Sequence, residues 1–142
     1  MSVINLLNER LQNKWSFDTT MKIQDEMIPA MIEGKDIVAE SPTGSGKTLA
    51  FMLPILNKVD GSKKKTQALI VAPSQELAMQ IVEVIREWTE GTDITVQQLI
   101  GGANSARQIE KLKKKPTIVV GTPGRLNELA RQGKLKLREI ET

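Results

Sequence analysis

SPTGSGKT, residues 41–48, is the stretch of this 142-residue chain that decides its fold. A short apolar run, Asp36–Glu40 (DIVAE), comes before it, and an apolar helical pattern that continues through Leu56 comes after it. Gly44 and Gly46 allow the backbone to turn so that successive N–H groups point at an anion. A strand, a glycine-rich turn and a helix in this order predict a phosphate-binding loop.

The last two residues of this loop supply what nucleotide phosphates require. Lys47 brings a positive charge to the β and γ phosphates, and Thr48 brings a hydroxyl that can ligate Mg²⁺. Ser41 stands where the widest form of the motif has glycine. The alternative interpretation is a glycine-rich turn that carries a lysine by chance.

The rest of the chain alternates apolar runs with amphipathic helical patterns. The expected strands are residues 36–40, 67–72, 94–100 and 117–120. The expected helices are residues 3–12 and 23–32, a segment through Leu56, residues 74–90, one helix that starts near Ser105, and residues 122–132. Strands that alternate with helices predict an α/β fold whose parallel sheet is covered by helices on both faces.

Capping signals set several of these boundaries. Gly34 is expected to end the helix that contains Pro29. Ser105 and Gln108 have the spacing of a capping box. The pair Thr122–Pro123 fits the N-cap and the first helical position of the last helix.

Composition excludes several classes of chemistry. The chain has no cysteine and no histidine, so disulfides, thiol chemistry, histidine-dependent triads and histidine-ligated zinc are excluded. Hydrophobic residues make up 39%, which is enough for a core, and the net charge of +3 permits an anionic partner. Four lysines, Lys111, Lys113, Lys114 and Lys115, form a basic cluster that is interpreted as a solvated helix end.

Five segments, in order and spacing, resemble the first RecA-like domain of DEAD-box ATP-dependent RNA helicases. Phe17, seven residues before Gln24, resembles the family's Q motif. The other four are the phosphate loop, PSQELA at 73–78 (motif Ia), the glycine pair at 101–102 (the GG motif) and TPGR at 122–125 (motif Ib). The resemblance covers nearly the whole chain and implies a RecA-like fold, with residues 1–142 as a single partial ATP-binding domain and 1–34 as its Q-motif region.

The resemblance implies a nucleotide site for ATP or ADP with Mg²⁺. Gln24 would read the edge of adenine through its amide, and Phe17 would stack on the base. Thr48 would ligate the magnesium ion. The implied nucleotide-binding residues are Phe17, Gln24, Thr43, Gly44, Ser45, Gly46, Lys47 and Thr48.

The resemblance also implies contacts to the RNA backbone, which carry little sequence information. The implied RNA-binding residues are Pro73, Gln75, Glu76, Gly101, Gly102, Thr122, Pro123, Gly124 and Arg125. The chain departs from the family in two places that bear on these sites. Met21 replaces a hydroxyl residue that helps to place the phosphate loop, and Gln75 replaces an arginine of motif Ia.

Other interpretations stay open at this stage. Phe17 can be a core aromatic, Gln24 a helix-capping or surface residue, and Gly101–Gly102 and Thr122–Pro123 a turn and a helix start. Two other function classes also compete: a different P-loop kinase or nucleoside triphosphatase, and a noncatalytic module that binds RNA or a protein.

The chain ends at Thr142, before the family's Asp-Glu-Ala-Asp segment would appear. We therefore expect a fragment that binds ATP but holds no catalytic residue, with a second RecA-like domain in the parent helicase. An incomplete sheet predicts marginal stability or a dimer that exchanges strands. No signal peptide or apolar run of spanning length is found in the sequence, which favours a cytoplasmic protein without membrane segments.

Overall fold

The computed structural model describes residues 3–40, 46–101, 105–140 and 142. The chain falls into two compact units, residues 1–58 and 59–142, and each unit buries apolar side chains. The predicted loop residues Thr43, Gly44 and Ser45, together with Gly102 of the GG pair, lie outside the described residues.

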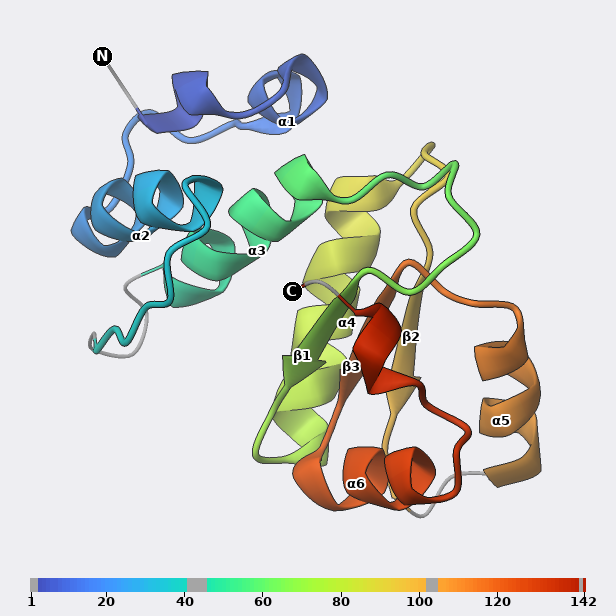
Figure 1. Cartoon of the computed structure of the whole chain (residues 1–142). Coiled ribbons are helices and arrows are strands. Elements are labelled where there is room, and N and C mark those ends of the chain that lie inside the picture. The colour runs from blue at the N-terminus through green and yellow to red at the C-terminus, as the bar shows by residue number, and fades with distance from the viewer. Residues whose placement is uncertain (1–2, 41–45, 102–104, 141) are drawn as a thin grey trace. The chain divides into compact units, whose positions relative to one another are not determined.

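The N-terminal unit is helical in its described part. Its elements are the 3₁₀ helix η1 (Val3–Leu6) and the α-helices α1 (Glu9–Lys14), α2 (Lys22–Ile32) and α3 (Lys47–Lys58) (Figure 1). Helices α2 and α3 pack against each other. The core residues that are completely shielded from solvent are Leu11, Ile28, Ala50, Met52, Leu53 and Leu56.

The predicted helix over residues 3–12 is two shorter elements. Asn8 separates them, because its side-chain Oδ1 accepts a hydrogen bond from the Leu11 N–H at 3.0 Å and caps α1. The expected apolar face is nevertheless buried, with Ile4, Leu7 and Leu11 at most 6% exposed. The periodicity was therefore a correct guide to burial and a wrong guide to helix continuity.

The predicted strand at Asp36–Glu40 is wrong. Residues 35–40 have no regular secondary structure, and the Val38 side chain is fully exposed. An apolar run becomes a strand only when a neighbouring strand supplies hydrogen bonds and a face to bury. No described segment pairs with residues 36–40. By contrast, the predicted helix end is confirmed, since Gly34 adopts a φ of +82° directly after α2.

The C-terminal unit alternates strands and helices, as predicted. Its elements are β1 (Ala68–Val71), α4 (Gln75–Thr89), β2 (Val96–Leu99), α5 (Ser105–Lys113), β3 (Ile118–Gly121), α6 (Pro123–Arg131) and the 3₁₀ helix η2 (Leu137–Glu139). The three strands lie within one residue of the predicted runs, or inside them. The α/β class is therefore confirmed.

The three described strands form a parallel sheet in the order β1-β3-β2. Ala68 of β1 and Val96 of β2 both pair with Ile118 of β3. The described strand that comes last in the sequence, β3, is therefore the central one. All four residues of β3 are buried. On the outer side of β1, the Leu69 N–H donates to the Thr142 carbonyl at 2.8 Å.

Helices cover both faces of this sheet, as predicted. One face carries a core in which leucines of α5, α6 and the following loop pack on β2 and β3; its buried members are Leu99, Leu112, Val119, Leu126, Leu129 and Leu135. Helix α4 lies along the opposite face (Figure 1). Its apolar stripe is buried at Ile81, Ile85 and Trp88, while Leu77 in its first turn is 37% exposed.

Candidate functional site

The N-terminal unit places the end of the phosphate loop at the start of α3. Gly46 has a φ of +81°, which an L side chain rarely adopts, and it leads directly into the first turn of the helix. Lys47 is exposed and Thr48 is half-buried in that turn. Free backbone N–H groups and the helix dipole make such a turn electropositive, so an anion is favoured there.

The side chain of Gln24 touches this loop. Its Nε2 donates to the Gly46 carbonyl at 3.4 Å, and its Oε1 accepts from the Met21 N–H at 2.9 Å. Gln24 thus caps the start of α2 and also joins the predicted Q motif to the phosphate loop. The residue is 3% exposed. An amide has two acceptor lone pairs and two N–H hydrogens, so one of each remains after these two bonds.

Gly46 is required by space as well as by backbone angle. A Cβ at this position would lie 2.5 Å from Gln24 Nε2 and 2.9 Å from Met21 Sδ. Gly34 has nearly the same φ, but a Cβ there would meet nothing within 4 Å. The comparison indicates that Gly46 lets residues 21–24 approach the loop.

Phe17 is 56% exposed, so it is not the core aromatic that the sequence left open. Its ring meets that of Trp15 edge to face, with centroids 4.9 Å apart. The contact orients one edge of Phe17 and leaves much of the ring in solvent, where a planar ligand can stack.

The described residues fit a magnesium nucleotide only through the loop end. Gly46, Lys47 and Thr48 offer backbone N–H groups, a cation and one hydroxyl. Within the described ranges, no three acidic side chains gather in a way that could hold a metal ion.

In the C-terminal unit, the three predicted RNA-facing segments lie together at the carboxyl ends of the sheet's strands. Each follows the carboxyl end of a strand, and backbone bonds hold them in register: Ala72 N–H to Gly121 at 2.9 Å and Thr122 N–H to Leu99 at 3.3 Å. The Gln75 Nε2 donates to the Gly101 carbonyl at 2.9 Å, which joins motif Ia to the GG segment.

Most of these residues present themselves to solvent. Those that are exposed are Pro73, Gln75, Glu76, Pro123 and Gly124, while Gly101 and Thr122 are half-buried. Helices α4 and α6 begin here, and Ser74 and Thr122 occupy their N-cap positions as expected. Pro123 has no N–H, so the first free amides of α6 belong to Gly124 and Arg125.

Arg125 differs from its neighbours because its side chain is buried, at 7% exposure. Its Nε donates to Gln108 Oε1 at 3.0 Å, and its Nη1 lies 3.2 Å from Glu128 Oε1. The remaining Nη2 is buried without a hydrogen-bond partner among the described residues. The guanidinium therefore braces α6 against α5, and only its main chain lies at the helix start.

The Ser105 side chain of the predicted capping box lies outside the described residues, whereas the hydrogen bonds of the Gln108 amide are described. Its Nε2 donates to the Ile100 carbonyl at 3.1 Å while its Oε1 receives Arg125, so both ends of the amide are used away from the start of α5. Sequence reasoning missed this link. A signal was present, since Gln108 lies four residues before the buried Leu112 on the same helical face. A polar residue at a buried position needs a hydrogen-bonding partner.

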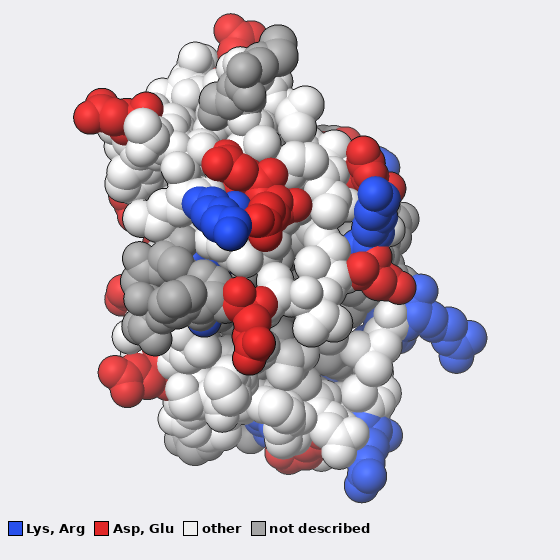
Figure 2. Space-filling model, turned by 90° about the vertical axis from the view of Figure 1, so that its left-hand side faces the viewer, with Lys and Arg blue, Asp and Glu red and all other residues white. Residues whose placement is uncertain are grey.

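The lysine cluster at the end of α5 does not adjoin the three predicted RNA-facing segments. Helix α5 starts after the carboxyl end of β2 and leads into the amino end of β3. Residues 111–115 therefore lie at the amino ends of the strands. Figure 2 shows acidic and basic side chains in small separate groups on the face in view.

The sequence of this chain is similar to those of known proteins. The family model described as DEAD/DEAH box helicase matches residues 21–142. The chain is 49% identical to "DEAD-box ATP-dependent RNA helicase CshC" of Bacillus cereus, covering 93% of this chain and 35% of that protein. It is 47% identical to "Probable ATP-dependent RNA helicase YfmL" of Bacillus subtilis, covering 93% and 36%.

A solved structure shares the fold of this chain over most of its length. A DEAD box protein from Methanococcus jannaschii superimposes with a TM-score of 0.87 at 32% identity, covering 94% of this chain and 38% of that one. The fold is thus the RecA-like α/β fold of these DEAD-box proteins. The chain belongs to the DEAD/DEAH box helicase family.

The chain spans about a third of the length of the curated relatives that it matches, 35% and 36% of the two named above. None of the helices that the structure describes has both the length and the apolar character needed to cross a membrane.

Proposed function

We propose that the chain is the ATP-binding, RNA-contacting first RecA-like domain of a DEAD-box RNA helicase. The observation that carries the proposal is the hydrogen bond from Gln24 Nε2 to the Gly46 carbonyl. A glutamine that only capped α2 would need no contact with the phosphate loop. The whole protein would add a second RecA-like domain and couple ATP binding and hydrolysis to local separation of RNA strands.

In the nucleotide site, each residue has a separate task. Phe17 offers an exposed ring for adenine, and the unused lone pair and N–H of Gln24 match the donor and acceptor on the adenine edge. Lys47 and the first turn of α3 attract the phosphates. Magnesium, when bound, neutralises phosphate charge, and Thr48 is the residue that would hold it.

The RNA would lie across the carboxyl ends of the three strands. The main-chain N–H groups of Gly124 and Arg125 at the start of α6 suit phosphate oxygens, since the helix dipole adds positive potential there. The Gln75–Gly101 hydrogen bond keeps two of the three segments at a fixed separation. Contacts of this kind bind RNA without reading its bases.

A fluorescent ADP analogue, titrated with Mg²⁺ against the 142-residue chain, tests the nucleotide site. We expect saturable binding that Lys47→Ala weakens about a hundredfold, because charge-assisted contacts to phosphate are lost. Gln24→Ala should weaken it about tenfold, the effect of roughly 1.4 kcal/mol. ADP should compete and GDP should not.

The matched control is Lys35→Ala. Lys35 is exposed and pairs with Glu33 at 2.9 Å after the end of α2, so its loss removes the same charge from the same unit. It should leave the affinity unchanged. Equal competition by GDP would instead indicate another class of P-loop enzyme. A folded chain that binds RNA normally but binds no nucleotide would support the noncatalytic module.

A further inference from the structure

A second surface of the C-terminal unit has no part in the proposed nucleotide or RNA sites. It is a cavity of about 550 Å³ between α4, the outer side of β2 and α5. Figure 1 shows β2 at one side of the sheet with α5 beyond it. The cavity is lined by residues 95–98 of the strand and by side chains of the two helices.

The strand edge at this cavity is open to pairing. The Thr95 carbonyl accepts a hydrogen bond from Ile118 of β3, and the Leu99 carbonyl accepts one from Thr122, directly after β3. Neighbouring residues of a strand point their backbone groups in opposite directions. The N–H and C=O groups of Val96 and Gln98 are therefore directed away from β3. No described segment pairs with this edge, whereas the outer side of β1 pairs with Thr142.

The walls of the cavity are basic. Arg86 of α4 and Arg107, Lys111 and Lys114 at α5 line it, and no acidic residue does. The last three are spaced by four and three residues, so they share one helical face. Arg86, Lys111 and Lys114 are exposed, so their charges can meet a ligand in the cavity.

A buried acceptor also lies at this cavity. Gln97 lines it and is 7% exposed. Its Nε2 donates to the Gln108 carbonyl at 2.8 Å, which fixes the orientation of the amide. Its Oε1 has no hydrogen-bond partner among the residues that the structure describes. Buried polar atoms are rarely left unpaired, so a donor from a ligand would complete this site.

We propose that this groove, lined by β2 and the basic face of α5, binds an extended acidic peptide segment of a protein partner. A polypeptide strand offers the alternating N–H and C=O groups that the Val96 and Gln98 edge requires, and this mode of binding adds a strand to the sheet. RNA offers phosphate acceptors but no such alternation. The basic walls select an acidic strand over neutral or basic ones.

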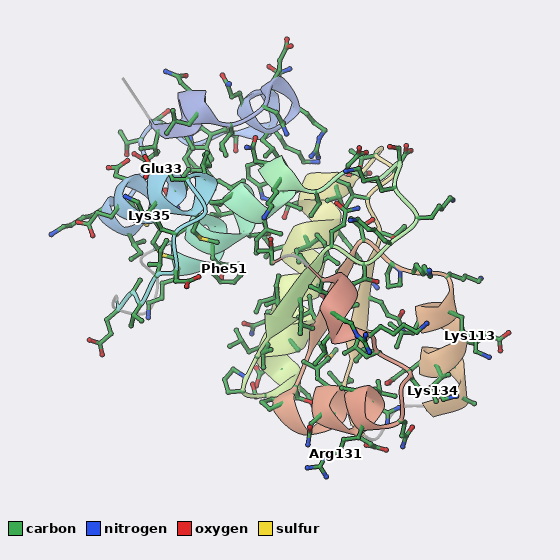
Figure 3. All side chains as sticks on the ribbon, in the orientation of Figure 1. Glu33, Lys35, Phe51, Lys113, Arg131 and Lys134 are labelled. Carbon is green, nitrogen blue, oxygen red and sulfur yellow. The ribbon has the colours of Figure 1, made fainter. Side chains whose placement is uncertain are left out.

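Two lysines of the same cluster provide the contrast that the test needs. Lys113 and Lys115 line a separate cavity of about 300 Å³ together with Lys134 and Lys136. Figure 3 shows Lys113 on α5 and Lys134 beyond α6. Alternate residues of one short lysine run thus belong to two different cavities.

The probe is a fluorescein-labelled peptide of about eight residues, a strand's length, that alternates Glu and Val. Fluorescence anisotropy with the 142-residue chain should give saturable binding. Lys111→Glu/Lys114→Glu should weaken it about tenfold by charge repulsion. Lys113→Glu/Lys115→Glu, which makes the same change of charge, should alter it less than about twofold. Lys111→Arg/Lys114→Arg should retain binding and shows that the site tolerates substitution.

The peptide itself tests strand pairing without any change to the protein. N-methylation of alternate residues removes the N–H groups that the β2 edge needs, and should weaken binding about tenfold. Equal binding of the N-methylated peptide would overturn the proposal, as would equal effects of the two lysine pairs. Displacement by single-stranded oligouridylate that depends on Lys111 and Lys114, with no effect of N-methylation, would assign the groove to RNA instead.

This proposal stands apart from the nucleotide site. Lys47→Ala, which should weaken nucleotide binding about a hundredfold, should leave peptide binding unchanged. A chain that binds the peptide but no ADP analogue would contradict the proposed function alone, and the reverse result would contradict the groove alone.

Discussion

Gln24 in the N-terminal unit and Gln108 in the C-terminal unit are both buried, and both join segments that are distant in sequence. The partners of Gln24 are main-chain groups, the Met21 N–H and the Gly46 carbonyl. Gln108 also uses a main-chain carbonyl, that of Ile100, but its other partner is the guanidinium of Arg125.

The difference decides how each junction fails. Main-chain partners persist whatever side chain stands at their position, so the Gln24 junction depends on close approach to a residue without a Cβ. The Gln108 junction supports a buried cation, which is tolerated only while it is hydrogen-bonded. The first is sensitive to shape and the second to the loss of a polar atom.

The largest effect is expected from Gly46→Ala. The new Cβ would clash with Gln24 and would also force a left-handed φ on alanine, so we expect a loss of about 2–4 kcal/mol in the free energy of unfolding. Urea unfolding measures it, and nucleotide affinity should fall with it. Gly34→Ala has the same φ penalty without the clash and should cost about 1–2 kcal/mol. Equal costs would show that the approach of Gln24 adds nothing.

Gln108→Ala should be next in size. It leaves the Arg125 Nε and the Ile100 carbonyl without their partner, so we expect a loss of about 2–3 kcal/mol by urea unfolding. Arg125→Met removes the cation, and the double variant completes a cycle. We expect a coupling energy of about 1–2 kcal/mol, and additive losses would contradict the link.

Gln75 is a third glutamine, and unlike Gln24 and Gln108 it is exposed. Its replacement tests how charge in motif Ia affects the affinity for RNA. Gln75→Arg introduces the arginine that the family resemblance implies at this position of motif Ia. One added phosphate contact should raise affinity for single-stranded RNA about threefold at low salt and steepen the salt dependence. The matched change Gln80→Arg, five residues further along α4, should do less. Equal gains would indicate a general charge effect.

The smallest effect is a pH dependence at Asp60. The hydroxyl and backbone N–H of Ser62 donate to its carboxylate and hold the pKa of Asp60 below its ordinary value, with Lys63 adding attraction. A lowered folded-state pKa gives stability that is present above the unfolded pKa, near 4, and is lost as the pH falls through the folded pKa. Asp60→Asn should remove this small slope from the melting temperature as the pH falls below about 4.

Gln67 provides the control for that slope. Its amide clamps the Asp60 backbone through bonds of 2.7 and 2.8 Å and does not touch the carboxylate. Gln67→Ala should therefore lower the melting temperature at every pH and leave the slope unchanged. A lost slope in Gln67→Ala would mean that the carboxylate depends on the turn as a whole.

The sequence predicted the C-terminal unit better than the N-terminal one, for a physical reason. The apolar runs at 67–72 and 117–120 contain β1 and β3, which pair with each other, so each run has the partner that a strand needs. The run at 36–40 has a similar pattern, but no described strand accepts it. Apolar periodicity reports what a segment tends to bury and says nothing about which partner is available.

The candidate sites divide in the same way. Local motifs predicted a turn at Gly46, a helix after the loop and a helix start at Thr122–Pro123, because turns and caps depend on adjacent residues. The Gln108–Arg125 bond joins two helices across seventeen positions and could not be read from either helix alone. The role of Gln24 lies between these cases: its cap is local and its contact with Gly46 is not.

The order of the sheet has a consequence for synthesis on the ribosome. β1 and β2 are made first, but each pairs with β3 and not with the other. Both strands therefore leave the ribosome before their common partner exists, while α4 and α5 can form locally. Until residues 118–121 emerge, two edges of a future sheet stay open to chaperones and to mispairing with other chains. Assembly of the sheet thus waits for a segment of four residues, Ile118–Gly121.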